Sequence, residues 1–203
     1  MPDSVRFTET MAGWVSPAVT ETHEAAAAVG RASGQRASFT LTMLTPDVDR
    51  MVADPEHRSP AFGLVQCPAL HPLPLRVDDG HLDLFVDVAP GVLHMRYQLG
   101  LTAVDGVRYR LNGYKEVVRR RWWPTVLTDT TTLFVDVAAD GAPRLRGILT
   151  MGPGGVTAQG LTFRGEGAVF GLAGIVRYLA YYVRRCVGVY LGPRRAPLRR
   201  PDA

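Results

Sequence analysis

The chain has 203 residues, of which 46% are hydrophobic, and a formal net charge of +4. This length and composition favour one soluble globular unit with a substantial core. Residues 194–203 contain four arginines and one aspartate, so they carry +3 of the charge. The remaining body is near +1 and has no basic face for nucleic acid, so we expect no nucleic-acid partner. The predicted organisation is a single domain over residues 1–193 and a disordered basic tail over residues 194–203.

Segments of alternating apolar and polar residues follow one another through most of the chain. Alternation with a period of two predicts β-strands with one buried face. The expected strands are 7–15, 37–44, 62–67, 82–88, 92–101, 107–118, 127–137, 145–151 and 157–164. Asp105-Gly106 is a hairpin signal between two of them. About nine or ten strands at regular spacing predict a mainly β fold, an antiparallel barrel of the calycin or lipocalin kind with a C-terminal α-helix.

Three helices are expected among the strands. Residues 23–31 are alanine-rich, and residues 46–53 follow Thr45, a suitable N-cap. Residues 168–191 form the one long helix, with an apolar stripe at three-four spacing that comprises Leu172, Ile175, Val176, Leu179, Val183, Cys186, Val187 and Tyr190. Arg177, Arg184 and Arg185 argue against a membrane span, so no stable membrane insertion is expected. A helix packed on the barrel is favoured over one that lies in a membrane interface.

Lys115 is the only lysine of the chain, and strand alternation places it in the apolar row of residues 107–118. A buried ammonium group needs a carboxylate partner or a changed pKa. Glu9, between Phe7 and Met11, and Asp129, between Leu127 and Thr131, are the acidic candidates on apolar faces. We therefore predict that Glu9, Lys115 and Asp129 point to the same side of the curved sheet. A structural ion pair and a role in ligand handling both fit this placement.

Other residues on the inferred inward faces complete a candidate site. Tyr97 and Tyr109 offer hydroxyl groups, and Thr131 and Gln159 are neutral polar companions. The apolar wall is predicted to comprise Met11, Phe39, Met43, Leu84, Met95, Leu149 and Phe163. These residues line either an ordinary core or an elongated, mainly apolar cavity whose few polar groups include Lys115.

Familiar catalytic signatures are missing from the sequence. There is no Gly-x-Ser-x-Gly elbow, no P-loop, no dinucleotide fingerprint and no histidine pair at metal spacing. We therefore expect neither a cofactor nor a metal. Cys67 and Cys186 lie in unrelated segments and predict no disulfide framework. Residues 1–6 lack the layout of a secretory signal, so the predicted location is the cytoplasm.

Several stretches resemble a module that accompanies the flavin domain in actinobacterial proteins of the cholesterol oxidase-like GMC oxidoreductase group. They are FTETMAG (7–13), DVDRMVADPEHRS (47–59), GYKEV (113–117), DTTTLF (129–134), GILTM (147–151) and the C-terminal helix. Glu9, Lys115 and Asp129 all lie inside these motifs. The sequence contains no flavin domain, so the resemblance does not imply oxidase activity. The resemblance implies an acidic, tryptophan-bearing stretch before DTTTL, whereas residues 119–128 here read RRRWWPTVLT.

The expected architecture also looks like that of calycin-type barrels that act as cofactor-free cyclases in bacterial polyketide pathways. The first hypothesis is such a cyclase, of the pericyclase or Diels–Alderase kind, that folds a polyketide-like apolar substrate inside the barrel. Lys115, Tyr97 or Tyr109 would polarise a carbonyl group, with Glu9 and Asp129 as their partners. The alternative is a lipid- or steroid-binding module that serves a separate oxidoreductase or hydrolase. The expected partner is an apolar small molecule in both cases, and a homodimer is left open.

Overall fold

The computed structural model of the chain describes residues 2–17, 22–118, 125–139, 142–152, 154–167 and 171–191. The tail over 194–203 that we predicted to be disordered lies outside the described residues. The same holds for most of the arginine- and tryptophan-rich stretch that departs from the resembled family, namely residues 119–124.

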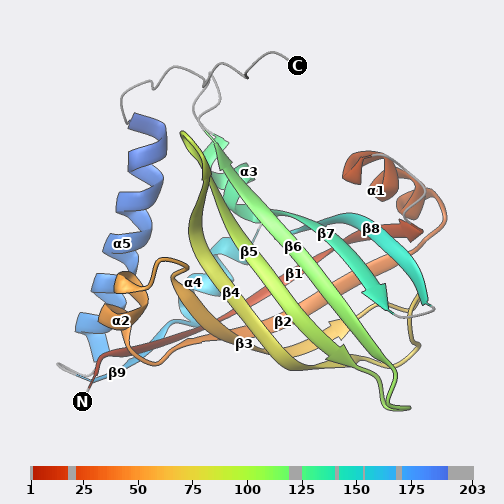
Figure 1. Cartoon of the computed structure of the whole chain (residues 1–203), viewed down its shortest axis with the longest axis horizontal. Coiled ribbons are helices and arrows are strands. Elements are labelled where there is room, and N and C mark those ends of the chain that lie inside the picture. The colour runs from red at the N-terminus through yellow and green to blue at the C-terminus, as the bar shows by residue number, and fades with distance from the viewer. Residues whose placement is uncertain are drawn as a thin grey trace.

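The described strands form one antiparallel sheet of nine strands in the order β2-β3-β4-β5-β6-β7-β8-β1-β9, and β1 also pairs with β2 (Figure 1). Because β1 pairs with both β2 and β8, eight strands close into a barrel and β9 adds to the other part of β1. The strands are β1 (Ser4–Pro17), β2 (Arg36–Thr45), β3 (Arg58–Gln66), β4 (Leu75–Ala89), β5 (Val92–Thr102), β6 (Arg108–Val118), β7 (Thr132–Ala139), β8 (Ala142–Thr150) and β9 (Arg164–Glu166). The predicted antiparallel barrel with a C-terminal helix is confirmed.

Alternation along the strands places the predicted apolar faces inside. In β1, Phe7, Glu9 and Met11 are buried, while Thr8 and Thr10 lie outside and their hydroxyl groups contact Thr42 and Thr40 of β2 at 3.0 and 3.2 Å. Such cross-strand threonine pairs stabilise the register from the outer surface. The same register keeps the whole buried row of β1 in the core, since a slip by one residue would turn it outward.

The hairpin predicted at Asp105-Gly106 joins β5 and β6. The Asp105 carboxylate accepts a hydrogen bond from the Val107 amide at 3.1 Å, and Gly106 has a φ of 86°. Glycine adopts this left-handed conformation without steric cost. The turn aligns β5 with β6 so that Met95 lies opposite Lys115 and Tyr97 lies opposite Gly113.

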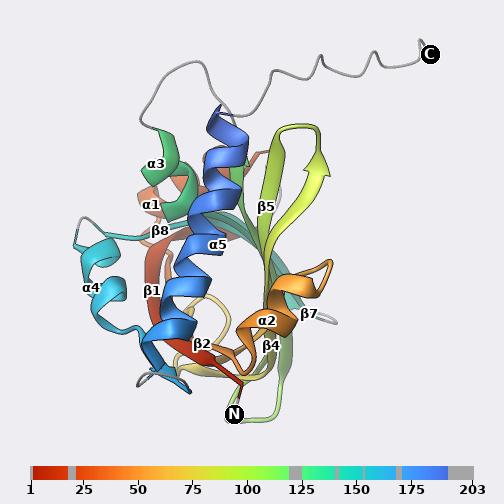
Figure 2. The same ribbon diagram turned by 90° about the vertical axis from the view of Figure 1, so that its left-hand side faces the viewer.

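The described residues form five helices around the barrel: α1 (His23–Ala32), α2 (Val48–Ala53), α3 (Thr125–Thr131), α4 (Gly155–Leu161) and α5 (Leu172–Leu191). Helix α1 packs on β1 and β8. Helix α5 lies across one end of the barrel, and Figure 2 shows it in front of the opening. None of the helices in the described ranges is both long enough and apolar enough to span a bilayer.

Two predicted strands are wrong in part. Residues 125–131 form helix α3, and only from Thr132 onward does the chain enter β7. Helix α3 packs against β6 and β7, and such tertiary contacts override a weak local preference for strand. Residues 155–161 form helix α4 and not a strand, which leaves β9 as three residues. Asp129, Thr131 and Gln159 therefore lie on helices and not on inward strand faces.

Two helix predictions also need correction. The N-cap of α2 is Asp47, whose side chain accepts from the Arg50 amide at 2.9 Å, whereas Thr45 belongs to β2 and contacts Ser59 at 2.8 Å. In α5, the face that packs on the barrel contains Tyr178, Tyr181, Cys186 and Val189. Most of the predicted stripe is exposed, namely Leu172, Val176, Leu179, Val183 and Val187. Apolar residues occur on most sides of this helix, so three-four spacing fits more than one face.

Candidate functional site

The buried charges predicted from the sequence meet inside the barrel. Glu9 of β1 and Lys115 of β6 are 1% and 3% exposed, and the Lys115 ammonium donates a hydrogen bond to Glu9 Oε1. In the closed sheet β1 is separated from β6 by β7 and β8 on the shorter way round, so the ion pair crosses the interior. Lys115 therefore has the carboxylate partner that its position in an apolar row requires.

Tyr97 of β5 joins this pair from the neighbouring strand. Its hydroxyl donates to Glu9 Oε2 at 2.8 Å, and Lys115 Nζ lies 5.3 Å from the centre of the Tyr97 ring. Burial, and then the negative charge of Glu9, raise the pKa of Tyr97 well above its usual value. Tyr97 therefore keeps its proton and acts as a hydrogen-bond donor. We refer to Glu9, Tyr97 and Lys115 as the interior cluster.

The interior cluster is enclosed by apolar side chains. The Phe39 ring of β2 lies 6.2 Å from the Tyr97 ring, centre to centre. The predicted wall residues Met11, Phe39, Met43, Leu84, Met95 and Leu149 are all buried members of the core, and Phe163 packs against it. In these surroundings the charge of Lys115 and that of Glu9 are shielded little by water, so their geometry is held firmly.

Helix α5 completes this end of the barrel with tyrosines that sequence reasoning missed. Tyr178 packs against Phe7 and Phe163 with ring centres 5.7 and 6.0 Å apart, and Tyr182 packs against Phe85 at 4.8 Å. Burial is the main cause that raises the pKa of both tyrosines, and the Glu9 charge adds to it. The available signal was the spacing of Tyr178, Tyr181 and Tyr182 along the C-terminal helix.

Asp129 is buried as predicted, but it belongs to a different contact. Its carboxylate accepts a hydrogen bond from the Tyr190 hydroxyl at 2.7 Å, which ties α3 to α5. The prediction that it shares a sheet face with Glu9 and Lys115 is wrong because residues 125–131 are helical. Among the described residues Lys115 forms its ion pair with Glu9 and not with Asp129.

Tyr109 lies too far along β6 to act with Lys115. Six residues of strand separate the two, or about 20 Å, and the Tyr109 hydroxyl donates to the Leu70 carbonyl at 3.2 Å. Thr131 and Gln159 are only partly buried, at the end of α3 and in α4. The structure thus brings together Glu9, Tyr97 and Lys115 from the predicted set, and it places Tyr109, Asp129, Thr131 and Gln159 elsewhere.

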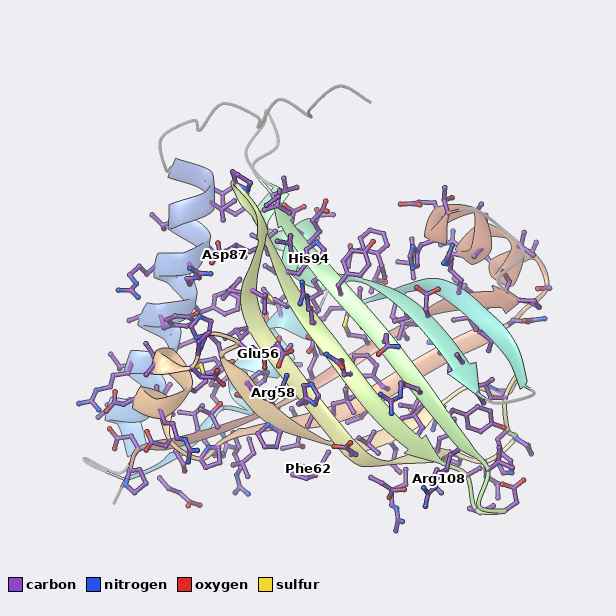
Figure 3. All side chains as sticks on the ribbon, viewed as in Figure 1. Glu56, Arg58, Phe62, Asp87, His94 and Arg108 are labelled. Atoms are coloured by element: carbon purple, nitrogen blue, oxygen red, sulfur yellow. The ribbon has the colours of Figure 1, made fainter. Side chains whose placement is uncertain are left out.

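A hollow of about 710 Å³ lies near the β5–β6 hairpin and not at the interior cluster. Its lining includes Asp78, Asp79, Arg108 and Arg110, which are exposed, so it is an open and charged surface. Figure 3 shows Arg108 at the hairpin end of the molecule, far from Asp87, which contacts α5. This hollow does not match the apolar cavity around Lys115 that the sequence analysis expected.

Within the described part of the chain, no three histidine, cysteine, aspartate or glutamate side chains gather in a way that would hold a metal ion. Cys67 and Cys186 are both free and buried, in agreement with the prediction that they form no disulfide. Burial raises the pKa of each thiol to about 11. Both are therefore protonated near neutral pH and weak nucleophiles.

Comparisons of the chain with models of known protein families, with curated proteins and with solved structures gave no match. The functional argument therefore depends on the interior cluster and on the elements that enclose it.

Proposed function

We propose that this protein is a cofactor-free cyclase of the pericyclase or Diels–Alderase kind. In this proposal an elongated, polyketide-like apolar substrate is folded inside the barrel against the interior cluster. The observation that carries it is a hydrogen-bonded ammonium, carboxylate and phenol held together in an otherwise apolar interior. Fixed donors in such surroundings stabilise negative charge that develops on a carbonyl oxygen more strongly than water does.

Lys115 is the proposed catalytic residue. Its ammonium group has three N–H donors, and among the described residues it gives a hydrogen bond only to Glu9. The remaining donors would bind a substrate carbonyl oxygen and draw electron density from the reacting system. Glu9 is the proposed positioning residue, because it holds both Lys115 and Tyr97 through its two carboxylate oxygens.

Apolar contacts would supply the other part of the rate enhancement. Holding a flexible chain in a reactive conformation removes several kcal/mol from a barrier, on the order of 7–11 kcal/mol in favourable cases. The wall residues Met11, Phe39 and Met95 are the surfaces against which the chain would fold. Helix α5 contributes Tyr178 and Tyr182 to the same end, so we propose that its displacement admits the substrate.

The second candidate function is a lipid- or steroid-binding module that serves a separate oxidoreductase or hydrolase. The observation that favours it is that Lys115 and Glu9 already neutralise each other. A paired, apolar interior suits the retention of a ligand with a single oxygen function and requires no chemistry. This candidate also agrees with the resemblance to the module of the GMC oxidoreductase group.

Turnover distinguishes the two candidates. Linear polyketide precursors that bear a diene and a carbonyl-activated alkene would be incubated with the wild type, with Lys115→Ala and with no protein. The cyclase proposal predicts that the wild type changes the rate and the product stereochemistry, and that Lys115→Ala returns both towards the uncatalysed values. Tyr114→Phe, on the outer face next to Lys115, is the matched control that should keep wild-type activity.

An unchanged rate and isomer ratio with the wild type would rule out the cyclase for the precursors tested. Native mass spectrometry of the protein purified from its producer then tests the binding module, because a retained lipid or steroid adds a defined mass. The proposed location for either function is the cytoplasm, and the two buried free thiols fit a reducing compartment.

A further inference from the structure

Helix α5 has an apolar face that no described residue covers. Its side chains recur every three or four residues over Leu172–Leu191, and each is between 43% and 57% exposed. They are Leu172, Val176, Leu179, Val183 and Val187, which we call the outer stripe. The opposite face of the same helix is buried on the barrel through Tyr178, Tyr181, Cys186 and Val189.

The outer stripe is long and continuous. Fifteen residues of helix separate Leu172 from Val187, which corresponds to about 22 Å at the helical rise. Figure 2 shows α5 running along the surface that faces the viewer, with α2 and α4 on either side. Contiguous exposed aliphatic surface of this kind marks an interaction site on a folded protein.

The charges around the outer stripe favour an anionic partner. Arg184 is exposed on α5 beside the stripe. Three acidic side chains are paired with other arginines of the helix: Arg177 contacts Asp3 and Asp49 at 3.1 Å each, and Arg185 contacts Asp87 at 2.8 Å. The acidic groups in these pairs would therefore oppose an approaching anion less than free carboxylates would.

The sequence that follows α5 is also strongly basic. Residues 192–203 contain Arg194, Arg195, Arg199 and Arg200 against one aspartate, which is +3 of the formal +4 of the chain. An apolar helix face joined to a cluster of arginines is the combination that binds anionic bilayers, since each basic residue near such a surface contributes about 1 kcal/mol.

We propose that the outer stripe of α5 is the docking surface for an anionic lipid bilayer. The helix lies in the interface with its valine and leucine side chains among the acyl chains and Arg184 at the level of the lipid headgroups. The basic sequence after residue 191 adds to the electrostatic attraction. A second copy of the chain would also cover the stripe, but such a pairing leaves the arginine cluster without a role. The proposal concerns the surface of the molecule and stands whether the barrel acts as an enzyme or as a carrier.

Sedimentation of the full chain with lipid vesicles tests the proposal. We expect binding to phosphatidylcholine vesicles that contain phosphatidylglycerol and much weaker binding to phosphatidylcholine alone. The variant Val176→Ser/Val183→Ser should lower the partition coefficient about tenfold or more, because it removes apolar area from the bilayer. The variant Arg199→Ser/Arg200→Ser should lower binding to the anionic vesicles about tenfold.

A matched control uses exposed apolar residues at the other end of the barrel. Leu73→Ser/Val104→Ser changes two side chains as exposed as those of the stripe, in the turns before β4 and before β6, and should bind like the wild type. Thermal unfolding confirms that each variant is folded.

Absence of binding to the anionic vesicles would overturn the proposal, as would equal losses in the stripe variant and the control variant. Light scattering measures the oligomeric state and so tests for the homodimer that the sequence analysis left open. A dimer that Val176→Ser/Val183→Ser converts to monomer, without a vesicle-bound state of the wild type, would show that a second copy covers the outer stripe.

Discussion

At the scale of single residues, the informative position is Lys115. An isolated lysine in an apolar strand row requires a partner, and the structure supplies Glu9 across the barrel. The Tyr97 hydroxyl donates to the other oxygen of the same carboxylate. A buried pair of this kind adds little net stability, but removal of one member leaves the other as an uncompensated charge. The two members of the pair are not equivalent, because Glu9 also accepts the hydrogen bond from the Tyr97 hydroxyl.

We therefore expect Lys115→Met to destabilise the fold less than Glu9→Leu. In Lys115→Met the Glu9 carboxylate still accepts from Tyr97, whereas Glu9→Leu leaves both the ammonium group and the Tyr97 hydroxyl without an acceptor. Removal of one member of the buried ion pair costs about 3–5 kcal/mol of unfolding free energy. In Glu9→Leu the Tyr97 hydroxyl without an acceptor adds about 1–3 kcal/mol. Urea unfolding of both single variants and the double variant measures this. A double variant less stable than both single variants would contradict the pairing.

The lowered pKa of His94 predicts that the free energy of unfolding falls at acidic pH. Burial lowers its pKa from 6.5, and the nearby Glu116 carboxylate, at 3.6 Å, only partly offsets this. Below pH 6.5 the unfolded chain takes up the proton more readily than the native state, so stability falls with pH down to the lowered native value. Above pH 6.5 both states are neutral and the contribution is absent.

The matching experiment compares wild type with His94→Gln. The variant should lose less unfolding free energy than the wild type between about pH 7 and pH 5. The difference between the two proteins isolates His94, because the carboxylates that also titrate are common to both. Parallel pH profiles would show that His94 does not contribute.

At the scale of elements, contact with the barrel decides what each helix tolerates. Gly30 of α1 lies against β1, and a Cβ atom at this position would be 2.3 Å from the Val15 carbonyl oxygen. Gly188 of α5 has no atom within 4 Å of the equivalent position. The same residue type thus has a packing role in one helix and none in the other.

Alanine substitutions should therefore have opposite effects in these two helices. Gly188→Ala should stabilise the protein by up to about 1 kcal/mol, which is the helix propensity difference. Gly30→Ala should destabilise it despite the same propensity gain, because α1 must move away from β1. Thermal unfolding of the two variants measures whether each substitution raises or lowers stability. An equal increase in stability would show that α1 does not pack closely on the strand.

At the scale of the whole molecule, closure of the sheet encloses ionisable side chains from distant parts of the chain. Tyr97 from β5 and Tyr178 and Tyr182 from α5 all have pKa values raised by burial. The native barrel therefore holds these protons where the unfolded chain releases them, so stability is complete below about pH 10 and falls as the pH rises above it.

Tyr97→Phe tests this alkaline loss. The variant should show a shallower fall in unfolding free energy between about pH 9 and pH 11 than the wild type, although its stability at neutral pH is lower. Urea unfolding at several pH values gives the slopes, and tyrosine absorbance reports ionisation. Ionisation of all tyrosines in the folded protein at these pH values would contradict the buried placement.

The sequence by itself determined the barrel and the inward direction of all three members of the interior cluster, but not their contacts with one another. Alternation with a period of two assigns each strand residue to a face, so Glu9, Tyr97 and Lys115 were placed inward without knowledge of the fold. The tertiary structure alone decided that β1 lies across from β5 and β6, so that these side chains meet. It also decided the helical state of residues 125–131, the pairing of Asp129 with Tyr190, and which side of α5 is buried. These outcomes depend on contacts between segments far apart in the chain, which local periodicity does not encode.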